Sequence, residues 1–327
     1  MTRKDYIGFG IFNLFIACIP FLILNEYYLG TLVFAAVNTL AAIGLCLVMG
    51  YAGQISLGHA AFIGLGAYTS GILTVKLGLS PWPALAAGIG ISVIIAYFVG
   101  VPSLRLKGHY LAMATLGFAS IVHIVMVAAT ELTGGPQGIN GIPYISLFGF
   151  EMDSDVKFYY FSWAVVSLGL FLALNLIHSR VGRALRAIHG SEDAAQSTGI
   201  NTSTYKIQVF ILSAAYASVA GSLYASYVNY IDPGPFGVGH SILLVTMVAV
   251  GGMHNIWGAI TGAVILSLLP EFLSFTTEYL NAFGIEYKPD YDTLIYGGIL
   301  LFIMLFMPEG LFHGVASLFS SVKRKSA

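Results

Sequence analysis

The chain has 327 residues, of which 57% are hydrophobic and 9% charged, and its mean hydropathy is +0.84. Soluble domains average about 25% charged residues, so this sequence has too few charges to cover a surface that faces water. The composition excludes an ordinary soluble domain and predicts an all-α fold, a polytopic bundle of transmembrane helices. Its surroundings are then membrane lipid, and no nucleic acid is expected among its partners.

Apolar runs recur along the chain at the length that a membrane requires. A spanning helix needs about 20 mostly apolar residues, because its backbone groups must pair internally in lipid. The sequence predicts about 8–10 membrane segments, some of them short or interrupted, within one domain covering residues 1–327. The expected runs are 6–24, 29–49, 56–77, 82–102, 109–130, 158–178, 207–229, 241–253, 256–275 and 292–309.

The first run follows a basic start, MTRKDYIGFG, as the apolar part of a signal peptide does. Because many further spans follow, we expect an uncleaved first helix, with cleavage as the alternative. Cys18 and Cys46 both lie inside apolar runs, so the sequence does not indicate a disulfide framework.

Lysine and arginine residues indicate the orientation, because they concentrate in the cytosolic loops of membrane proteins. With the N-terminus in the cytosol, Lys76, Lys157 and Lys288 are the three basic residues outside. The other eleven of the 14 fall inside, which also favours an even number of spans and a cytosolic C-terminus. These eleven are Arg3, Lys4, Arg105, Lys107, Arg180, Arg183, Arg186, Lys206, Lys323, Arg324 and Lys325.

The predicted spans contain few ionisable groups, and His123 is the only one deep in a long span. Such residues often mark an ion or substrate path. His123 either lines a path or packs as a neutral, hydrogen-bonded imidazole between helices. Carboxylates for ion coupling are scarce, and no phosphate-binding loop, metal-ligand cluster, nucleophile elbow or dinucleotide motif occurs. We therefore expect no enzyme activity, metal or bound cofactor in this chain.

Two glycine-rich stretches interrupt the apolar pattern: GYAGQISLGHAAFIGLGAY at 50–68 and GGMHNIWGAITGAVIL at 251–266. The glycines are typical of closely packed membrane helices. The interruptions themselves are typical of transporters, in which broken segments in two halves indicate an internal repeat and a substrate site. Gln54, Ser56 and His59 are then polar groups near a gate or path.

The loop at 131–157 is expected outside the membrane. Its glycines and prolines exclude a continuous helix. The loop is either an exposed connector or a docking surface for an external partner.

The most polar stretch, 179–206, is expected on the cytosolic side. Arg180, Arg183 and Arg186 are spaced by three residues and give one helix a basic face. Gly190 is placed to end that helix. Contact with lipid headgroups is enough to explain the three arginines.

A second, short helix is predicted after Gly190, and lipid contact does not explain it. Ser191 is a good N-cap, and Glu192 and Asp193 favour the positive end of a helix dipole. Gly199 is placed to end the helix in the left-handed conformation. With Ala194 and Ala195 expected to be exposed, this helix suits a groove on another protein.

The stretch GRALRAIHGSEDAAQSTGIN resembles the coupling segment of ABC importer permeases, whose motif has a Glu-Ala-Ala core followed by a glycine. Here Asp193 stands between Glu192 and the two alanines. Together with GYAGQISLGHAAFIGLGAY, TGGPQGINGIP, AGSLYASYVNYID and VAVGGMHNIWGAITGAVIL, this stretch makes most of residues 30–310 similar to the LivM-type permeases of branched-chain amino acid importers.

The resemblance implies a multi-pass permease subunit of the bacterial inner membrane that moves branched-chain or related neutral amino acids. It implies a second, LivH-like permease as partner, two cytosolic ATPase subunits that use ATP and Mg, and an external substrate-binding protein. The residues expected to couple to the ATPase are Arg183, Arg186, Ser191, Glu192, Asp193, Ala194, Ala195 and Gly199. Gln54, Ser56, His59 and His123 are the candidates for the substrate path.

Three alternatives remain open from the sequence. A permease of the same class could carry urea, short amides or aromatic acids. An ion-coupled carrier or channel would act alone, without ATPase partners. A structural membrane scaffold is disfavoured by the interrupted spans and their polar breaks.

Overall fold

The computed structural model describes residues 3–22, 25–106, 108–147 and 150–282, together with 297–298, 301 and 305. Most of the expected run 292–309 lies outside the described residues. The same holds for the basic residues Lys107, Lys288, Lys323, Arg324 and Lys325.

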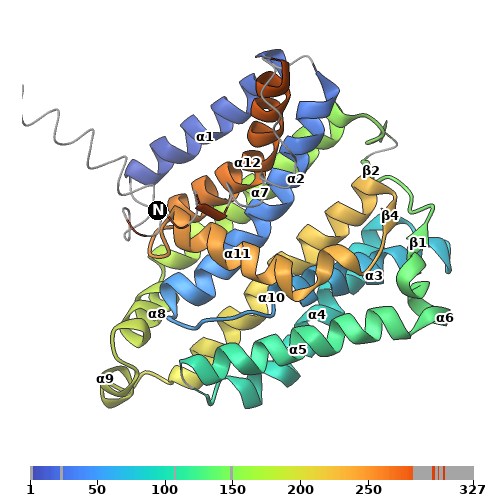
Figure 1. The fold of residues 1–327 in the computed structure, drawn as a ribbon. Coiled ribbons are helices and arrows are strands. Elements are labelled where there is room, and N and C mark those ends of the chain that lie inside the picture. The colour runs from blue at the N-terminus through green and yellow to red at the C-terminus, as the bar shows by residue number, and fades with distance from the viewer. Residues whose placement is uncertain are drawn as a thin grey trace, which may run out of the picture.

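The described chain is a bundle of helices, which confirms the all-α class (Figure 1). Within the described residues, seven helices are long and apolar enough to cross a membrane, and α3 and α11 are shorter apolar helices. The bundle consists of α1 (Arg3–Leu22), α2 (Glu26–Cys46), α3 (His59–Val75), α4 (Pro81–Ser103), α5 (His109–Ala128), α7 (Asp155–His178), α10 (Thr202–Val228), α11 (Val238–Gly251) and α12 (Ile256–Ala282).

One end of the bundle, here called the loop end, holds the segment predicted as the loop 131–157. Its pieces are α6 (Thr130–Thr133), a 3-10 turn at Gly135–Gln137 and three short strands, so it is not a continuous helix, as expected. Strand β1 (Ile139–Asn140) pairs antiparallel with β4 (Tyr230–Ile231), and β2 (Ser146–Leu147) pairs with β3 (Phe150–Glu151).

The opposite end, here called the α9 end, holds two helices outside the bundle. These are α8 (Arg180–Gly190) and α9 (Glu192–Ser197), which lie between α7 and α10 in the chain. In Figure 1, α8 and α9 extend away from the bundle at its lower left.

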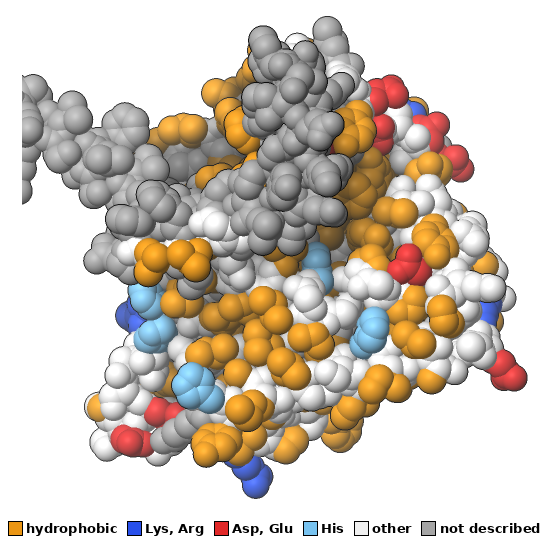
Figure 2. All heavy atoms as spheres, viewed as in Figure 1, with side chains coloured by type: hydrophobic (Ala, Val, Ile, Leu, Met, Phe, Trp, Pro, Cys, Tyr) orange, Lys and Arg blue, Asp and Glu red, His pale blue; other side chains and the backbone are white. Residues whose placement is uncertain are grey.

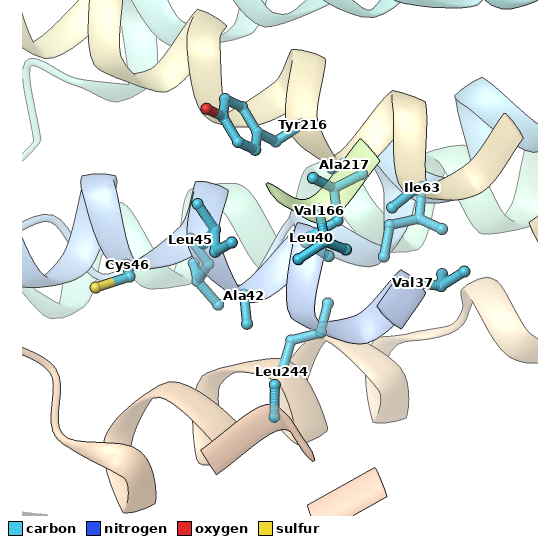
Figure 3. Packing of buried hydrophobic residues seen from close by; sticks show 14 of the residues in the cluster. Val37, Leu40, Ala42, Leu45, Cys46, Ile63, Val166, Tyr216, Ala217 and Leu244 are labelled. Carbon is cyan, nitrogen blue, oxygen red and sulfur yellow. The ribbon is translucent and has the colours of Figure 1, made fainter. Parts of the chain in front are cut away.

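Helix α2 is the central element of the core. Its sequence is apolar on all sides, which is typical of a helix surrounded by other helices, and it packs against α7, α10, α11 and α12. Figure 3 shows Leu40 and Leu45 of α2 between Tyr216 of α10 and Leu244 of α11. The core therefore forms around one helix that faces little lipid.

Glycine allows α3 and α10 to cross at backbone contact. A Cβ atom on Gly66 would overlap the carbonyl oxygen of Ser218, and one on Gly221 would overlap the carbonyl oxygen of Ile63. The hydroxyl of Ser222 donates to the carbonyl of Gly66 at 3.3 Å across the same crossing. This confirms the expected role of the glycines in close packing.

Helix α5 packs against few elements, and its outer face is nevertheless apolar. Tyr110, Met113, Ile121 and Ile124 are all exposed on this helix. Figure 2 shows this face as largely hydrophobic. An apolar outer surface suits contact with lipid or with another membrane-embedded subunit.

We predict that Gly221→Leu destabilises the protein strongly, because the side chain must displace the backbone of α3. Overpacking of this kind typically costs about 1–3 kcal/mol or more. The matched control is Gly90→Leu on α4, where a Cβ meets nothing within 4 Å. Thermal unfolding of both variants in detergent tests this, and equal unfolding temperatures would contradict the α3–α10 contact.

Candidate functional site

The segment 179–201 is built from three successive helix caps. The hydroxyl of Ser179 donates to the carbonyl of Leu176 at 2.7 Å and accepts from the amide of Val181 at 3.1 Å, so it ends α7 and begins α8. Ser191 accepts from the amide of Ala194 at 3.3 Å, which confirms it as the N-cap of α9. Asn201 then caps α10.

Gly199 ends α9 in the predicted manner. Its φ is +85°, in the left-handed region that favours glycine. The amide of Ile200 donates to the carbonyl of Ala195 at 3.1 Å and closes the turn. Gly190, also predicted as a helix end, is the last residue of α8, but its φ is not positive.

The predicted basic face of α8 is partly used within the chain. Nη1 of Arg186 donates to the carbonyl of Ile177 at 3.2 Å, and Nη1 of Arg183 donates to the carbonyl of His178 at 3.5 Å. These carbonyls belong to the last turn of α7, which has no intrahelical partners for them. Both arginines therefore help to fix the angle between α7 and α8.

Helix α9 presents one exposed face, and the expected exposure of its alanines is only half right. Asp193, Ala194 and Ser197 are exposed. Ala195 is buried, at 3% exposure, because its side of α9 lies against α8 and the start of α10. The surface available to another protein is therefore narrower than the sequence suggests.

Glu192 also faces inward, which the sequence did not indicate. Its Oε1 lies 2.6 Å from Nζ of Lys206, and the hydroxyl of Thr202 donates to the same oxygen at 3.4 Å. Lys206 is buried, so its ammonium group depends on this carboxylate. From the sequence, Lys206 was only one of the basic residues counted for orientation.

The first interruption, here called break 1, covers residues 47–58. Helix α2 ends in a π-helical turn at Leu47–Tyr51, and α3 begins at His59. His59 is buried, with Nε2 at 2.5 Å from the hydroxyl of Ser213 and Nδ1 at 3.4 Å from that of Ser56. Ser56 and His59 thus form a buried polar group with α10, and a role in a path stays a prediction.

Gln54 lies in break 1 beside the predicted coupling segment. It lines a cavity of about 140 Å³ together with His189, Glu192 and Lys206. Its side chain is buried, and neither amide atom has a hydrogen-bond partner among the described residues. A residue predicted for the substrate path is therefore placed against α9 and α10.

The second interruption, here called break 2, covers residues 252–255 between α11 and α12 and directly contacts the first. A Cβ atom on Gly50 would overlap the carbonyl oxygen of Met253. The thiol of Cys46 donates to that same carbonyl at 3.4 Å. The two glycine-rich stretches of the sequence therefore meet at the α9 end of the bundle.

His189 of α8 joins the predicted coupling segment to both breaks. Its ring lies 5.3 Å from that of His254 and next to the backbone of Gly50 and Gly53. Partial burial and the neighbouring His254 lower the pKa of His189. We call the group formed by Gly50, His189, Met253 and His254 the junction.

His123 does not join this group. It lies on α5, half-buried, with its ring 3.8 Å from the position of a Cβ on Gly237. Its Nδ1 has no hydrogen-bond partner among the described residues. The four predicted path residues therefore do not form one cluster.

Metal-binding groups were not found in the described ranges, where no three His, Cys, Asp or Glu residues gather around one point. The two cysteines, Cys18 and Cys46, are free.

Comparison of the sequence with known proteins identifies the family of this chain. Residues 27–304 match the family model described as the permease component of branched-chain amino acid transport systems. The chain is 32% identical over 292 residues to the LivM permease proteins of Salmonella typhimurium and Escherichia coli. The alignments cover 82% of this chain and 66% of those relatives, slightly less than two thirds of their length.

LivH of Salmonella typhimurium is 26% identical over 287 residues, with 83% of this chain and 90% of LivH covered. No solved structure matches the chain. The family model covers more than half of the sequence, including the helices that carry both breaks and the α8–α9 segment. The chain therefore belongs to the family of branched-chain amino acid transport permeases.

Proposed function

We propose that this chain is the membrane-spanning subunit of an ATP-driven importer of branched-chain or related neutral amino acids. The observation that carries the proposal is α9, a capped helix with an exposed face outside the bundle. A short helix of this kind suits a groove on a separate ATPase subunit, which would use ATP and Mg. The chain itself is then a transport subunit and not an enzyme.

The proposed orientation places the α9 end in the cytosol, with both termini on that side of a bacterial inner membrane. The excess of basic residues at this end supports it. The loop end then faces outward, where an external binding protein would deliver the substrate. Similarity to LivH as well as LivM supports a second permease of the same family as partner.

In this proposal, the junction carries motion from α9 to the membrane helices. His189 contacts both breaks, so a shift of α8 reaches the ends of α2 and α11 without an intervening flexible loop. Closely packed elements move as units, because dense packing resists gradual deformation. Gln54 and Ser56 of break 1, with His59 at the start of α3, would then act as a gate at the cytosolic end.

A transport assay tests the function and its substrate class. We expect labelled leucine to enter proteoliposomes holding this chain with its second permease and ATPases, dependent on ATP and the binding protein. An excess of unlabelled valine should compete, and urea, short amides or aromatic acids should not.

Urea uptake in the absence of leucine uptake would instead support the alternative, a permease of the same class for urea and related solutes. Transport by this chain alone under an ion gradient would instead favour the carrier or channel.

The end of α9 gives a second test. We expect Gly199→Val to reduce ATP-driven uptake while the protein still inserts, because a left-handed residue with a Cβ costs roughly 1–2 kcal/mol and loosens the turn. Gly190→Val is the matched control, since both glycines have open space but only Gly199 has a positive φ. Equal uptake by both variants would contradict the role of α9.

The junction predicts a pH dependence. The pKa of His189 is lower in the folded protein than its ordinary value, so the folded state binds fewer protons there than the unfolded state. Stability from this site should be complete above about pH 6.5 and decrease as the pH falls below it. Thermal unfolding between pH 8 and 5.5 measures this.

His189→Gln should remove part of that pH dependence, and His109→Gln, on the exposed start of α5, should leave it unchanged. An unchanged slope in His189→Gln would show that the junction does not titrate.

A further inference from the structure

The carboxylate of Glu192 is committed to a contact within the chain. It meets the ammonium group of Lys206 at 2.6 Å, with the two side chains 22% and 7% exposed. The hydroxyl of Thr202 donates to Glu192 at 3.4 Å and accepts from Nε2 of Gln196 at 2.9 Å. This network spans the turn between α9 and α10 and uses side chains from both helices.

The burial of Lys206 decides how firmly this contact holds. Leaving a buried charge without its partner is much more costly than losing an exposed ion pair. If α9 swung away from α10, the ammonium group of Lys206 would lose its carboxylate in a buried position. The pair therefore favours one orientation of α9 relative to α10.

That orientation selects the face that α9 offers to a partner. With Glu192 and Ala195 turned toward the bundle, Asp193, Ala194 and Ser197 are exposed together. A helix of six residues has too few backbone hydrogen bonds to keep its direction alone. Contacts with the rest of the chain must therefore set it.

Helix α10 continues the path from Lys206 into the bundle. It crosses α3 in backbone contact at Gly221 and packs against α2 and α4. The pair also lines the same cavity as Gln54 of break 1. A displacement of α9 would therefore reach the core by two routes, through α10 and through the junction.

We propose that Lys206 is a positioning residue for coupling: it holds Glu192 inward, so that α9 and α10 move as one unit. Only the part of the inference that concerns coupling to an ATPase rests on the proposed function. Glu192 then serves within this chain, and the ATPase meets the neighbouring exposed residues of α9.

The first experiment uses the full chain alone in lipid nanodiscs and needs no transport. Hydrogen exchange of the α9 amides should accelerate by more than about tenfold in Lys206→Met, and stay near wild type in Lys206→Arg. The double variant Glu192→Lys, Lys206→Glu should regain protection that Glu192→Lys loses.

The control for this measurement is Lys157→Met. Lys157 pairs with Asp153 at the same 2.6 Å, but with side chains 51% and 54% exposed, so local exchange should change little. Wild-type exchange of α9 in Lys206→Met would overturn the proposal, whatever the chain transports.

The second experiment measures substrate molecules imported per ATP hydrolysed in the assembled transporter. Lys206→Met and Glu192→Lys should each lower this ratio severalfold, and the charge-swapped double variant should restore most of it. If the double variant regained amide protection but stayed as uncoupled as Glu192→Lys, Glu192 would need a contact outside this chain, and the proposal would be wrong.

Discussion

Two helices end beside each other at the α9 end, and a hydrogen bond joins the two ends. A helix end leaves carbonyl and amide groups without partners, which is costly away from water. The amide of Gln54 turns back to the carbonyl of Val48 at 3.0 Å, and the carbonyl of Met253 accepts from Cys46 of the other segment. The ring of His189 lies next to the backbone of Gly50 and Gly53. These contacts hold the two breaks against each other and α8 against both.

Local sequence patterns predicted the elements of this fold well. Apolar length located the nine apolar helices of the described bundle, with most of their ends within a few residues, because a helix in lipid must satisfy its own backbone. The start of α10 at Thr202, five residues before the expected 207, follows from the cap at Asn201. Ser191 and Gly199 were also predicted correctly, since caps depend on neighbouring residues only.

The contacts between elements were beyond these patterns. Glu192 and Lys206 are 14 residues apart, and only the fold of the α9–α10 turn brings them together. The expected exposure of Ala195 failed for the same reason, since a six-residue helix has no clear apolar face to show which side is covered. The partner of His59 is Ser213, 154 residues away. A pattern of polarity can single out such residues, but it cannot show which residue each one contacts.

Helix α10 has a further consequence for the molecule as a whole. Its second turn carries Lys206, and the chain leaves its last turn directly into β4, which pairs with β1 of the 131–157 loop. One helix therefore connects the α9 end with the loop end of the bundle. Two ligands that each favour a different arrangement of this helix would be linked through it. Each would then change the affinity for the other by the same factor.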